Sequence, residues 1–437
     1  MKKRNKGSNK LLNAWAFYDW ANSVYTLTIA STIFPLYYGL LFFGRSNMVA
    51  IAGLEIKNSA LISFVTAFTF FVISFMSPIL AGIADYIGNK RIFLKLFCYI
   101  GSLGSIGLFW FDLEHIYISL LFYFLGLIGY WGGLVFYNSY LPDIAYPEQQ
   151  DSISAKGFSI GYLGSVLLLV INLVIVMKPS WFGITGEHPE KTAMKISFVT
   201  VGVWWSVFSQ YTFYYLPKGN GNKNCDVSHV LFNGFRALKK VWNQLKENFL
   251  LKRFLYAYFV YSMAVQTIML MAVYFGEQEI LWEDNNQKTI GLIISVLVIQ
   301  LVAVLGANFT SRMSSKYGNI KTLIGINMIW MLLCFIAYFI WTPFQFYITA
   351  GLVGFVMGGV QALSRSTYSK FLPNTEDTTS YFSFYDITEK VGIVIGMIIY
   401  GVIDQLTGSM RNGILFLFIF FLISVILLSK VPKQKMT

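Results

Sequence analysis

Charged residues deep within apolar segments are this chain's best candidates for chemistry, and three of them come first. Asp19 lies in the first segment, and Glu389 and Lys390 are adjacent in the eleventh. A charge in a hydrocarbon layer costs about 2.5–3.5 kcal/mol, so such side chains usually face a cavity or an opposite charge. Both carboxylates can exchange protons or bind a solute, whereas the alternative for Asp19 is a structural pair or a helix cap.

The spacing of these residues limits how they can pair. Asn22 follows Asp19 by about one helical turn, so the two side chains share a helix face. Glu389 and Lys390 point about 100° apart and need not pair with each other. Contact of Lys390 with Asp19, or of Glu389 with Arg365, would lock two parts of the chain in one conformation. The alternative for Lys390 is that it extends to the membrane surface. Arg365 has two possible roles, a positive-inside anchor and a planar fork that binds a carboxylate of substrate or of protein.

Uncharged hydrogen-bonding side chains accompany these charges in the first, fourth, seventh and tenth apolar segments. Each one alone is more simply explained as a packing residue. Together they favour the binding of a small polar or amphiphilic solute. They are Tyr18, Tyr137, Asn138, Tyr261, Gln266 and Gln361.

Enzymatic chemistry finds no support in the sequence. It contains no nucleotide-binding P-loop, no Ser/His/Asp set and no paired carboxylates, and its three histidines lack the spacing of metal ligands. The three cysteines indicate neither a disulfide framework nor a metal site. We therefore expect no cofactor, no metal and no enzyme activity.

The elements that must position these residues are twelve long apolar segments. At 1.5 Å per residue each can cross a hydrocarbon layer about 30 Å thick, and backbone groups in lipid are satisfied within a helix. The composition agrees, since 56% of the residues are hydrophobic and 12% are charged. We predict an all-α membrane protein with spans near residues 12–42, 58–82, 92–111, 115–140, 155–178, 195–216, 253–276, 289–311, 322–341, 345–366, 382–405 and 412–430.

The distribution of positive charge predicts the orientation of these spans. Most of the 33 Lys and Arg residues fall at the termini and in the even-numbered connections. The positive-inside rule therefore places both termini in the cytoplasm, with the protein in the inner (cytoplasmic) membrane. The net charge of +12 follows from this topology and does not indicate nucleic-acid binding. The first apolar segment is too long for a cleavable signal, and we expect it to be retained.

Similar stretches recur at a nearly constant offset. Gly88 and Gly318 lie in similar connections 230 positions apart, and Pro142 and Pro373 follow similar segments 231 positions apart. These matches predict a six-span unit duplicated in parallel. The expected units are an N-terminal bundle over residues 1–216, a linker over 217–251 and a C-terminal bundle over 252–437.

The linker contains an amphipathic pattern. Apolar residues alternate at steps of four and three, and Arg236, Lys239, Lys240 and Lys246 lie off that stripe. One interpretation is a helix on the cytoplasmic membrane surface, with its basic side toward anionic headgroups. The other is a linker helix packed on the bundle. The stripe consists of Leu231, Phe235, Leu238, Trp242, Leu245 and Phe249.

Glycines recur at close-packing intervals in three spans. Glycine lets helix axes approach closely in lipid, which suits both plain packing and the sliding of helices. Packing is the simpler explanation because glycine is common in membrane helices. The sets are Gly129 with Gly133, Gly157 with Gly161 and Gly164, and Gly354 with Gly358.

The connection after the second span has the pattern Asp85-x-x-Gly88-x-Lys90-Arg91. It resembles the signature loop of the major facilitator superfamily, although Ala81 stands where that superfamily usually has Gly. Gly88 permits a tight turn, and Lys90 and Arg91 are expected to anchor the loop in the cytoplasm. Asp85 can accept hydrogen bonds from the N-terminus of a neighbouring helix. The resemblance implies a gating role for Asp85, with a simple loop cap as the alternative.

Four further stretches lie at residues 18–23, 141–144 with 161–164, 358–366, and 384–386 with 389–390. Together they resemble the autophagy-related vacuole effluxer family, a branch of that superfamily. The resemblance implies two six-helix bundles with helices one, four, seven and ten around a central cavity, and fungal members are implicated in releasing amino acids from vacuoles. The family commonly has an acid in the seventh span, where this chain has Met263. If that acid carries protons in relatives, this chain must use another group or none.

These observations predict a monomeric secondary transporter in contact with membrane lipids. It would move a small organic solute, amino acids first, by efflux or proton-linked exchange, and rocking of the bundles would expose one site to each side in turn. The alternatives are an uncoupled facilitator, a non-transporting sensor or scaffold with a plugged cavity, and a lipid-handling protein with a lateral opening.

Overall fold

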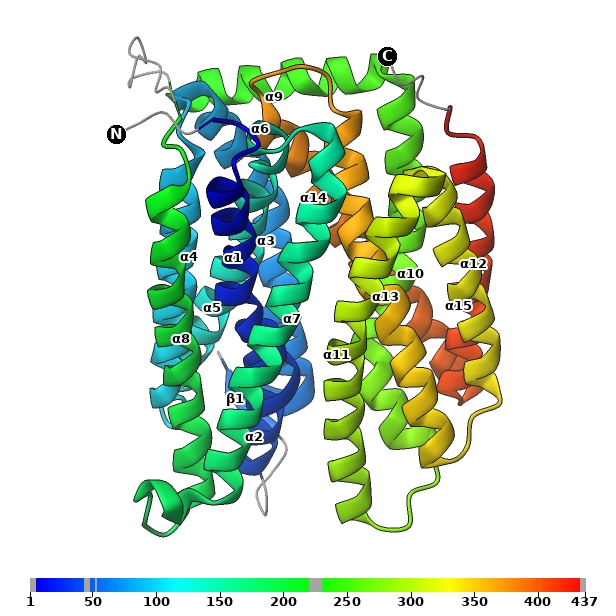
Figure 1. Cartoon of the computed structure of the whole chain (residues 1–437). Helices are drawn as coiled ribbons and strands as arrows, with labels where there is room; N and C mark the ends of the chain where they lie inside the picture. Colours follow the sequence, from blue (N-terminus) through cyan, green and yellow to red (C-terminus); the bar gives the residue numbers. More distant parts are fainter. Residues whose placement is uncertain (1–4, 43–47, 52, 220–229, 433–437) are drawn as a thin grey trace.

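The computed structural model describes residues 5–42, 48–51, 53–219 and 230–432, which are almost entirely helical. Long helices run roughly side by side in two groups, and α9 lies across one end of them (Figure 1). We call that end, where both chain termini also lie, the linker end. The first group contains α1 (Asn9–Val24), α2 (Phe34–Leu41), α3 (Asn58–Ile87), α4 (Lys90–Gly107), α5 (Ile116–Asn138), α6 (Leu141–Ile144), α7 (Pro147–Met177) and α8 (Pro189–Tyr215).

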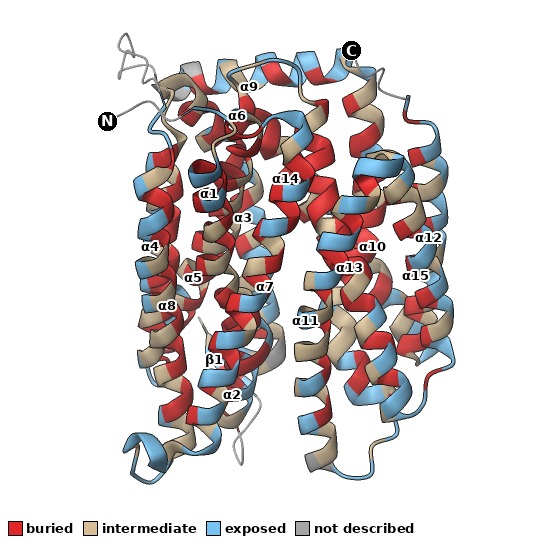
Figure 2. Ribbon diagram, in the orientation of Figure 1, coloured by how far each residue is buried: buried red, intermediate tan, exposed pale blue. Residues whose placement is uncertain are grey.

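The second group follows α9 (Val230–Glu247) in the chain. It contains α10 (Phe249–Glu279), α11 (Asn285–Tyr317), α12 (Asn319–Tyr338), α13 (Pro343–Phe371), α14 (Thr378–Thr407) and α15 (Met410–Ser429). Buried residues follow the inner faces of the helices, and exposed residues cover their outer faces (Figure 2). Many of the exposed side chains are large and apolar, which is the pattern of a surface that faces lipid rather than water.

The predicted fold class is confirmed. Within the described residues, ten helical segments are long and apolar enough to cross a membrane. The other two predicted spans correspond to α8, 27 residues long and rich in Trp, Tyr, Ser and Thr, and α14, 30 residues long with three charges in its middle. Both pack among the spans, α8 on α1 and α4, and α14 on α10 and α3. Several helices extend beyond the predicted apolar segments, so residues expected in connections lie in helical turns.

The first span departs from a simple helix. Between α1 and α2 the chain forms a π-helical segment, Tyr25–Ile33, just before Pro35. The connection after this span forms a short antiparallel hairpin, in which β1 (Met48–Ile51) pairs with β2 (Leu54–Lys57). Neither feature was predicted. π-Helical turns are often found at functional sites, and this one begins six residues after Asp19.

Close helix packing explains most of the glycines in the predicted sets. A Cβ atom on Gly358 of α13 would lie 2.1 Å from the carbonyl oxygen of Ala303 in α11, and one on Gly129 would lie 2.2 Å from Cα of Gly101. Gly133 is different, because its Cβ would meet nothing closer than 3.5 Å. Backbone-to-backbone contact therefore holds α11 to α13 and α4 to α5.

We predict that Gly358→Ala lowers the thermal unfolding temperature of the purified protein by several degrees. The added methyl has to displace backbone, and overpacking of this kind costs about 1–3 kcal/mol. Gly325→Ala in α12 is the matched control, since its Cβ would meet no atom within 4 Å. A melting curve in detergent checks the difference, and equal temperatures for the two variants would contradict the packing role.

The amphipathic helix of the linker is present as α9, but its apolar residues do not share one face. Val241 and Leu245 are buried, and α9 packs on α3. Phe235 and Trp242 are exposed, and Phe249 lies in α10. The predicted single stripe is therefore wrong in detail, because a bundle-facing row and an exposed aromatic row lie side by side on the helix. Leu231 lies outside the side chains that the structure describes.

Candidate functional site

A buried ion pair between Asp19 and Arg365 joins the two groups of helices. The Nη1 and Nη2 atoms of Arg365 each lie 3.3 Å from Oδ2 of Asp19. The Tyr137 hydroxyl donates to the same oxygen at 2.8 Å. Asp19 is 5% exposed and Arg365 3% exposed. We call this pair the interbundle lock, because Asp19 lies on α1 and Arg365 on α13.

Arg365 is held on every side. Its Nε atom donates to the hydroxyl of Ser154 at 2.9 Å, and Nη2 donates to the Ser154 carbonyl oxygen at 3.0 Å. Nη1 also donates to Oδ1 of Asn138 at 3.3 Å, and the guanidinium lies over the Phe158 ring at 4.1 Å. A planar guanidinium with five donors suits such multiple contact. Of its two predicted roles, the fork that binds a protein carboxylate is the one observed.

Gly157 on α7 makes room for the lock. A Cβ atom there would lie 2.5 Å from Oδ2 of Asp19 and 3.1 Å from Nη2 of Arg365. The neighbouring Gly161 and Gly164 let α7 approach α1 at Asp19 and Trp20 in the same way. The glycines of this span therefore shape the site as well as the packing.

A second charged cluster lies on α14. Lys390, which is fully buried, forms an ion pair with Asp386 one turn earlier on the same helix. Glu389 accepts a hydrogen bond of 2.6 Å from the side-chain amide of Gln266 on α10. The predicted pairs of Lys390 with Asp19 and of Glu389 with Arg365 are therefore not those formed. Nor does Lys390 extend to the membrane surface, since Asp386 holds it inside and it lies over the Trp131 ring of α5.

Some of the uncharged candidates form hydrogen bonds between helices, whereas others are buried within the first group. Gln361 accepts a hydrogen bond of 2.6 Å from Tyr162, which joins α13 to α7. Tyr261 bonds Ser364 at 2.7 Å. Tyr18 and Asn22 are buried within the first group, and the Tyr18 ring packs on Tyr137 and Phe213. Tyr137, rather than Tyr18, supplies the hydroxyl that contacts Asp19.

The signature loop contacts the second group as predicted for Asp85. Its carboxylate accepts hydrogen bonds from the backbone N–H groups of Thr379 at 3.2 Å and Ser380 at 2.6 Å, at the start of α14. A carboxylate at a helix N-terminus satisfies free N–H groups and complements the helix dipole. Asp85 lies in the last turn of α3, and the turn itself falls at Gly88, whose φ is 69°.

Lys90 and Arg91 make internal contacts, which differs from the expected role of simple cytoplasmic anchors. Lys90 forms an ion pair with Asp143 at 2.6 Å and donates to the Thr378 hydroxyl at 2.8 Å. Arg91 is buried and donates to the Leu216 carbonyl oxygen at 2.9 Å. Lys90 thus adds a second bond between the groups beside Asp85.

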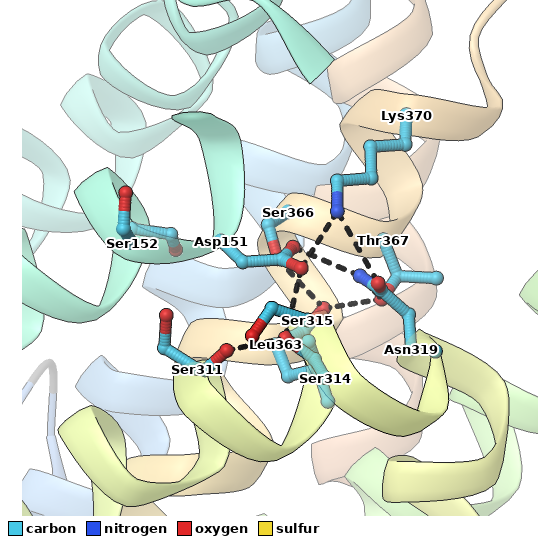
Figure 3. A network of polar contacts seen from close by, with 12 residues as sticks. Asp151, Ser152, Ser311, Ser314, Ser315, Asn319, Leu363, Ser366, Thr367 and Lys370 are labelled. Atoms are coloured by element: carbon cyan, nitrogen blue, oxygen red, sulfur yellow. Dashed lines mark hydrogen bonds and ion pairs between the residues drawn. The ribbon is translucent and has the colours of Figure 1, made fainter. Parts of the chain in front are cut away.

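The duplicated connection after α11 also forms a polar network between the two groups (Figure 3). In this network the acid does not belong to the connection itself but to the other group of helices. Here the acid, Asp151, lies on α7 and forms an ion pair with Lys370 of α13 at 2.6 Å. It also accepts hydrogen bonds from the Ser314 hydroxyl at 2.8 Å and from the Asn319 amide at 2.9 Å. Ser315, which aligns with Asp85, donates a hydrogen bond to the Arg312 carbonyl oxygen within its own helix.

The residues of this second network were not predicted. Asn319 and Asn89 occupy equivalent places in the duplicated connections, and Lys370 is part of the stretch that repeats after the tenth span. The repeat therefore indicated where Asn319 and Lys370 lie but not that Asp151 is their partner, because Asp151 lies in the other group of helices.

Polar contacts between the groups gather toward the linker end. They run from the two signature-loop networks through the interbundle lock to the bonds of Ser159 with Asn308 and of Tyr162 with Gln361. The ribbons of the two groups lie together at this end and diverge toward the opposite end (Figure 1). Such an arrangement closes one end with hydrogen bonds and ion pairs that can exchange for water. Within the described residues, no group of three His, Cys, Asp or Glu side chains is placed to hold a metal ion.

Comparisons with other proteins agree with this architecture. Residues 7–437 match the family model described as "Vacuole effluxer Atg22 like". The MFS-type transporter YxiO of Bacillus subtilis is 30% identical over 99% of this chain and 97% of the relative. Autophagy-related protein 22 of Eremothecium gossypii is 25% identical over 98% of this chain and 92% of the relative. The crystal structure of the transporter FucP in the outward conformation aligns with a TM-score of 0.70 at 14% identity, over 97% of this chain and 99% of that one.

Proposed function

Because this chain belongs to the vacuole effluxer Atg22-like family of the major facilitator superfamily and is an MFS-type transporter, we propose that it moves zwitterionic solutes, amino acids first, by alternating access. The observation that carries the proposal is the interbundle lock between Asp19 and Arg365. A buried ion pair between two bodies that must separate stabilises one conformation and releases in the other.

The proposed cycle opens and closes the linker end. In the conformation described above, the lock and both signature-loop networks hold that end shut. Opening it requires Asp85 to leave the start of α14 and Asp151 to leave Lys370. Each broken contact is replaced by water, so the energies of the two conformations can remain close. A solute that binds between the groups then reaches one side at a time.

Charges of both signs in the site favour a zwitterion. Lys390 and Arg365 can bind a substrate carboxylate, and Glu389 and Asp386 can bind a substrate ammonium group. The α14 cluster contains two carboxylates and one ammonium group, so one further positive charge would balance it. A proton and a substrate ammonium group are both suitable, and their competition for Glu389 would couple solute flux to protons.

We further propose that the protein lies in the cytoplasmic membrane with its linker end in the cytoplasm. This end holds α9 with its basic residues and the described ends of the chain, which contain Lys6, Lys10 and Lys430, as the positive-inside rule requires. The family description, vacuole effluxer, makes export the first direction to measure.

Flux into proteoliposomes tests this function. A neutral amino acid is expected to move faster than its N-acetyl and its amide derivatives, since each derivative lacks one of the two charges. A pH gradient is expected to change the rate, whereas an uncoupled facilitator would show no response. Transport of an uncharged sugar at the rate of the amino acid would contradict the proposed recognition, and no flux of any solute would favour a non-transporting sensor.

A further inference from the structure

The exposed face of α9 combines aromatic rings with positive charges. Phe232, Phe235 and Trp242 are 60%, 59% and 45% exposed. The Arg236 guanidinium lies 5.0 Å from the Phe232 ring centroid, and the Lys246 ammonium lies 5.1 Å from the Trp242 ring centroid. Large exposed aromatic side chains interleaved with cations are unusual on a surface that contacts only water.

The opposite face of α9 packs on the end of α3 whose Asp85 binds the start of α14. A Cβ atom on Gly82 of α3 would lie 2.3 Å from the carbonyl oxygen of Gly234, so the two backbones touch. Val241 and Leu245 are buried on the same side. Gly82 is less than one turn from Asp85, which binds the start of α14. α9 is therefore in direct contact with the end of α3 that carries the gating carboxylate.

α9 also contacts the other partner of that gate. Lys240 forms an ion pair with Asp377 at 2.8 Å, and this hydrogen bond raises the pKa of Lys240. The Tyr381 hydroxyl donates to the side-chain carbonyl of Gln244 at 3.2 Å. Asp377 and Tyr381 flank Thr379 and Ser380, whose N–H groups bind Asp85. The helix thus bridges α3 of the first group and α14 of the second while the linker end is closed.

We propose that α9 binds the surface of an anionic membrane through Phe232, Phe235, Arg236, Lys239, Trp242 and Lys246, and that this binding favours the conformation closed at the linker end. Aromatic rings partition to the level of the lipid headgroups, and basic side chains are attracted to anionic lipid. α9 lies across the ends of the spans, which is the depth at which headgroups are found. A soluble protein partner would fit this face less well, because the exposed aromatic side chains would lie against water whenever the partner was not bound.

Distance measurements in nanodiscs test this inference. Spin labels at Glu148 of the first group and Lys321 of the second group, both exposed at the linker end, report its opening. Cys98 and Cys334 are buried, so replacing Cys225 by Ser suffices to direct labelling. Phosphatidylglycerol in a phosphatidylcholine disc is expected to raise the population with the shorter distance several-fold, and added salt is expected to reduce the effect by screening.

The combined variant Arg236→Gln, Lys239→Gln and Lys246→Gln is expected to lose the response to phosphatidylglycerol. The matched control is Lys57→Gln, Lys178→Gln and Lys191→Gln, which removes the same charge at the opposite end and is expected to keep the response. The combined substitution Phe232→Gln and Phe235→Gln should weaken it without any change in charge.

Two results would overturn the inference: equal distance distributions in both lipids, or a full response in the variant of α9. Equal distance distributions would instead favour a protein partner for the exposed face of α9. The measurement requires no substrate, so its outcome is separate from that of the flux assay.

Discussion

Replacing Arg365 by alanine is expected to lower solute flux at least tenfold and to open the linker end. The substitution leaves the Asp19 carboxylate buried without its cation. Removal of one partner from a buried pair costs about 3–5 kcal/mol, and this cost applies to the conformation that buries the pair. Since about 1.4 kcal/mol corresponds to a factor of ten, the closed conformation would become a minor one. Flux in proteoliposomes and spin-label distances at the linker end measure the two effects.

Two further variants separate the lock from general damage. Arg312→Ala removes an exposed arginine of α11 at the same end and is expected to change neither flux nor distances. The double variant Asp19→Asn with Arg365→Gln leaves no orphaned charge, so it should close the linker end again without restoring flux. If Arg365→Ala retained wild-type flux and distances, the lock would have no part in transport.

Glu389→Gln is expected to abolish the response of flux to a pH gradient while exchange of solute down its own gradient continues. Glutamine preserves the size of the side chain and a hydrogen bond to Gln266, but it cannot release a proton. The remaining charges, Asp386 and Lys390, balance each other, so the cluster no longer requires a proton or a substrate cation. Initial rates measured with and without an imposed pH gradient check the expected loss.

The control for this variant is Glu376→Gln, which removes an exposed acid just before α14 and should leave the pH response intact. Wild-type dependence on the pH gradient in Glu389→Gln would exclude Glu389 as the coupling group. The next acid to test would then be Asp19, the other predicted protonation site, with Asp19→Asn.

Local chemistry made part of the site predictable. The spacing in the loop at Asp85 and Gly88 was enough to predict both the tight turn and the acceptance of hydrogen bonds at a helix N-terminus. Asp386 and Lys390 stand four positions apart, which places them on one helix face, so this signal was present although the pair was not predicted. The two-sided character of α9 was not predictable in full, because Phe235 and Leu245 look equally apolar in the sequence.

The sequence by itself determined that the chain crosses a membrane as helices, that its halves are repeats, and which charges are buried in apolar segments. These properties follow from hydropathy, helical period and spacing, which act over a few residues at a time. Only the tertiary structure decided the partners: Arg365 meets Asp19 across 346 positions, and Asp151 meets Lys370 across 219. Such pairs depend on which helices lie together and how each is rotated, and close glycine contacts such as Gly157 against Asp19 set that geometry.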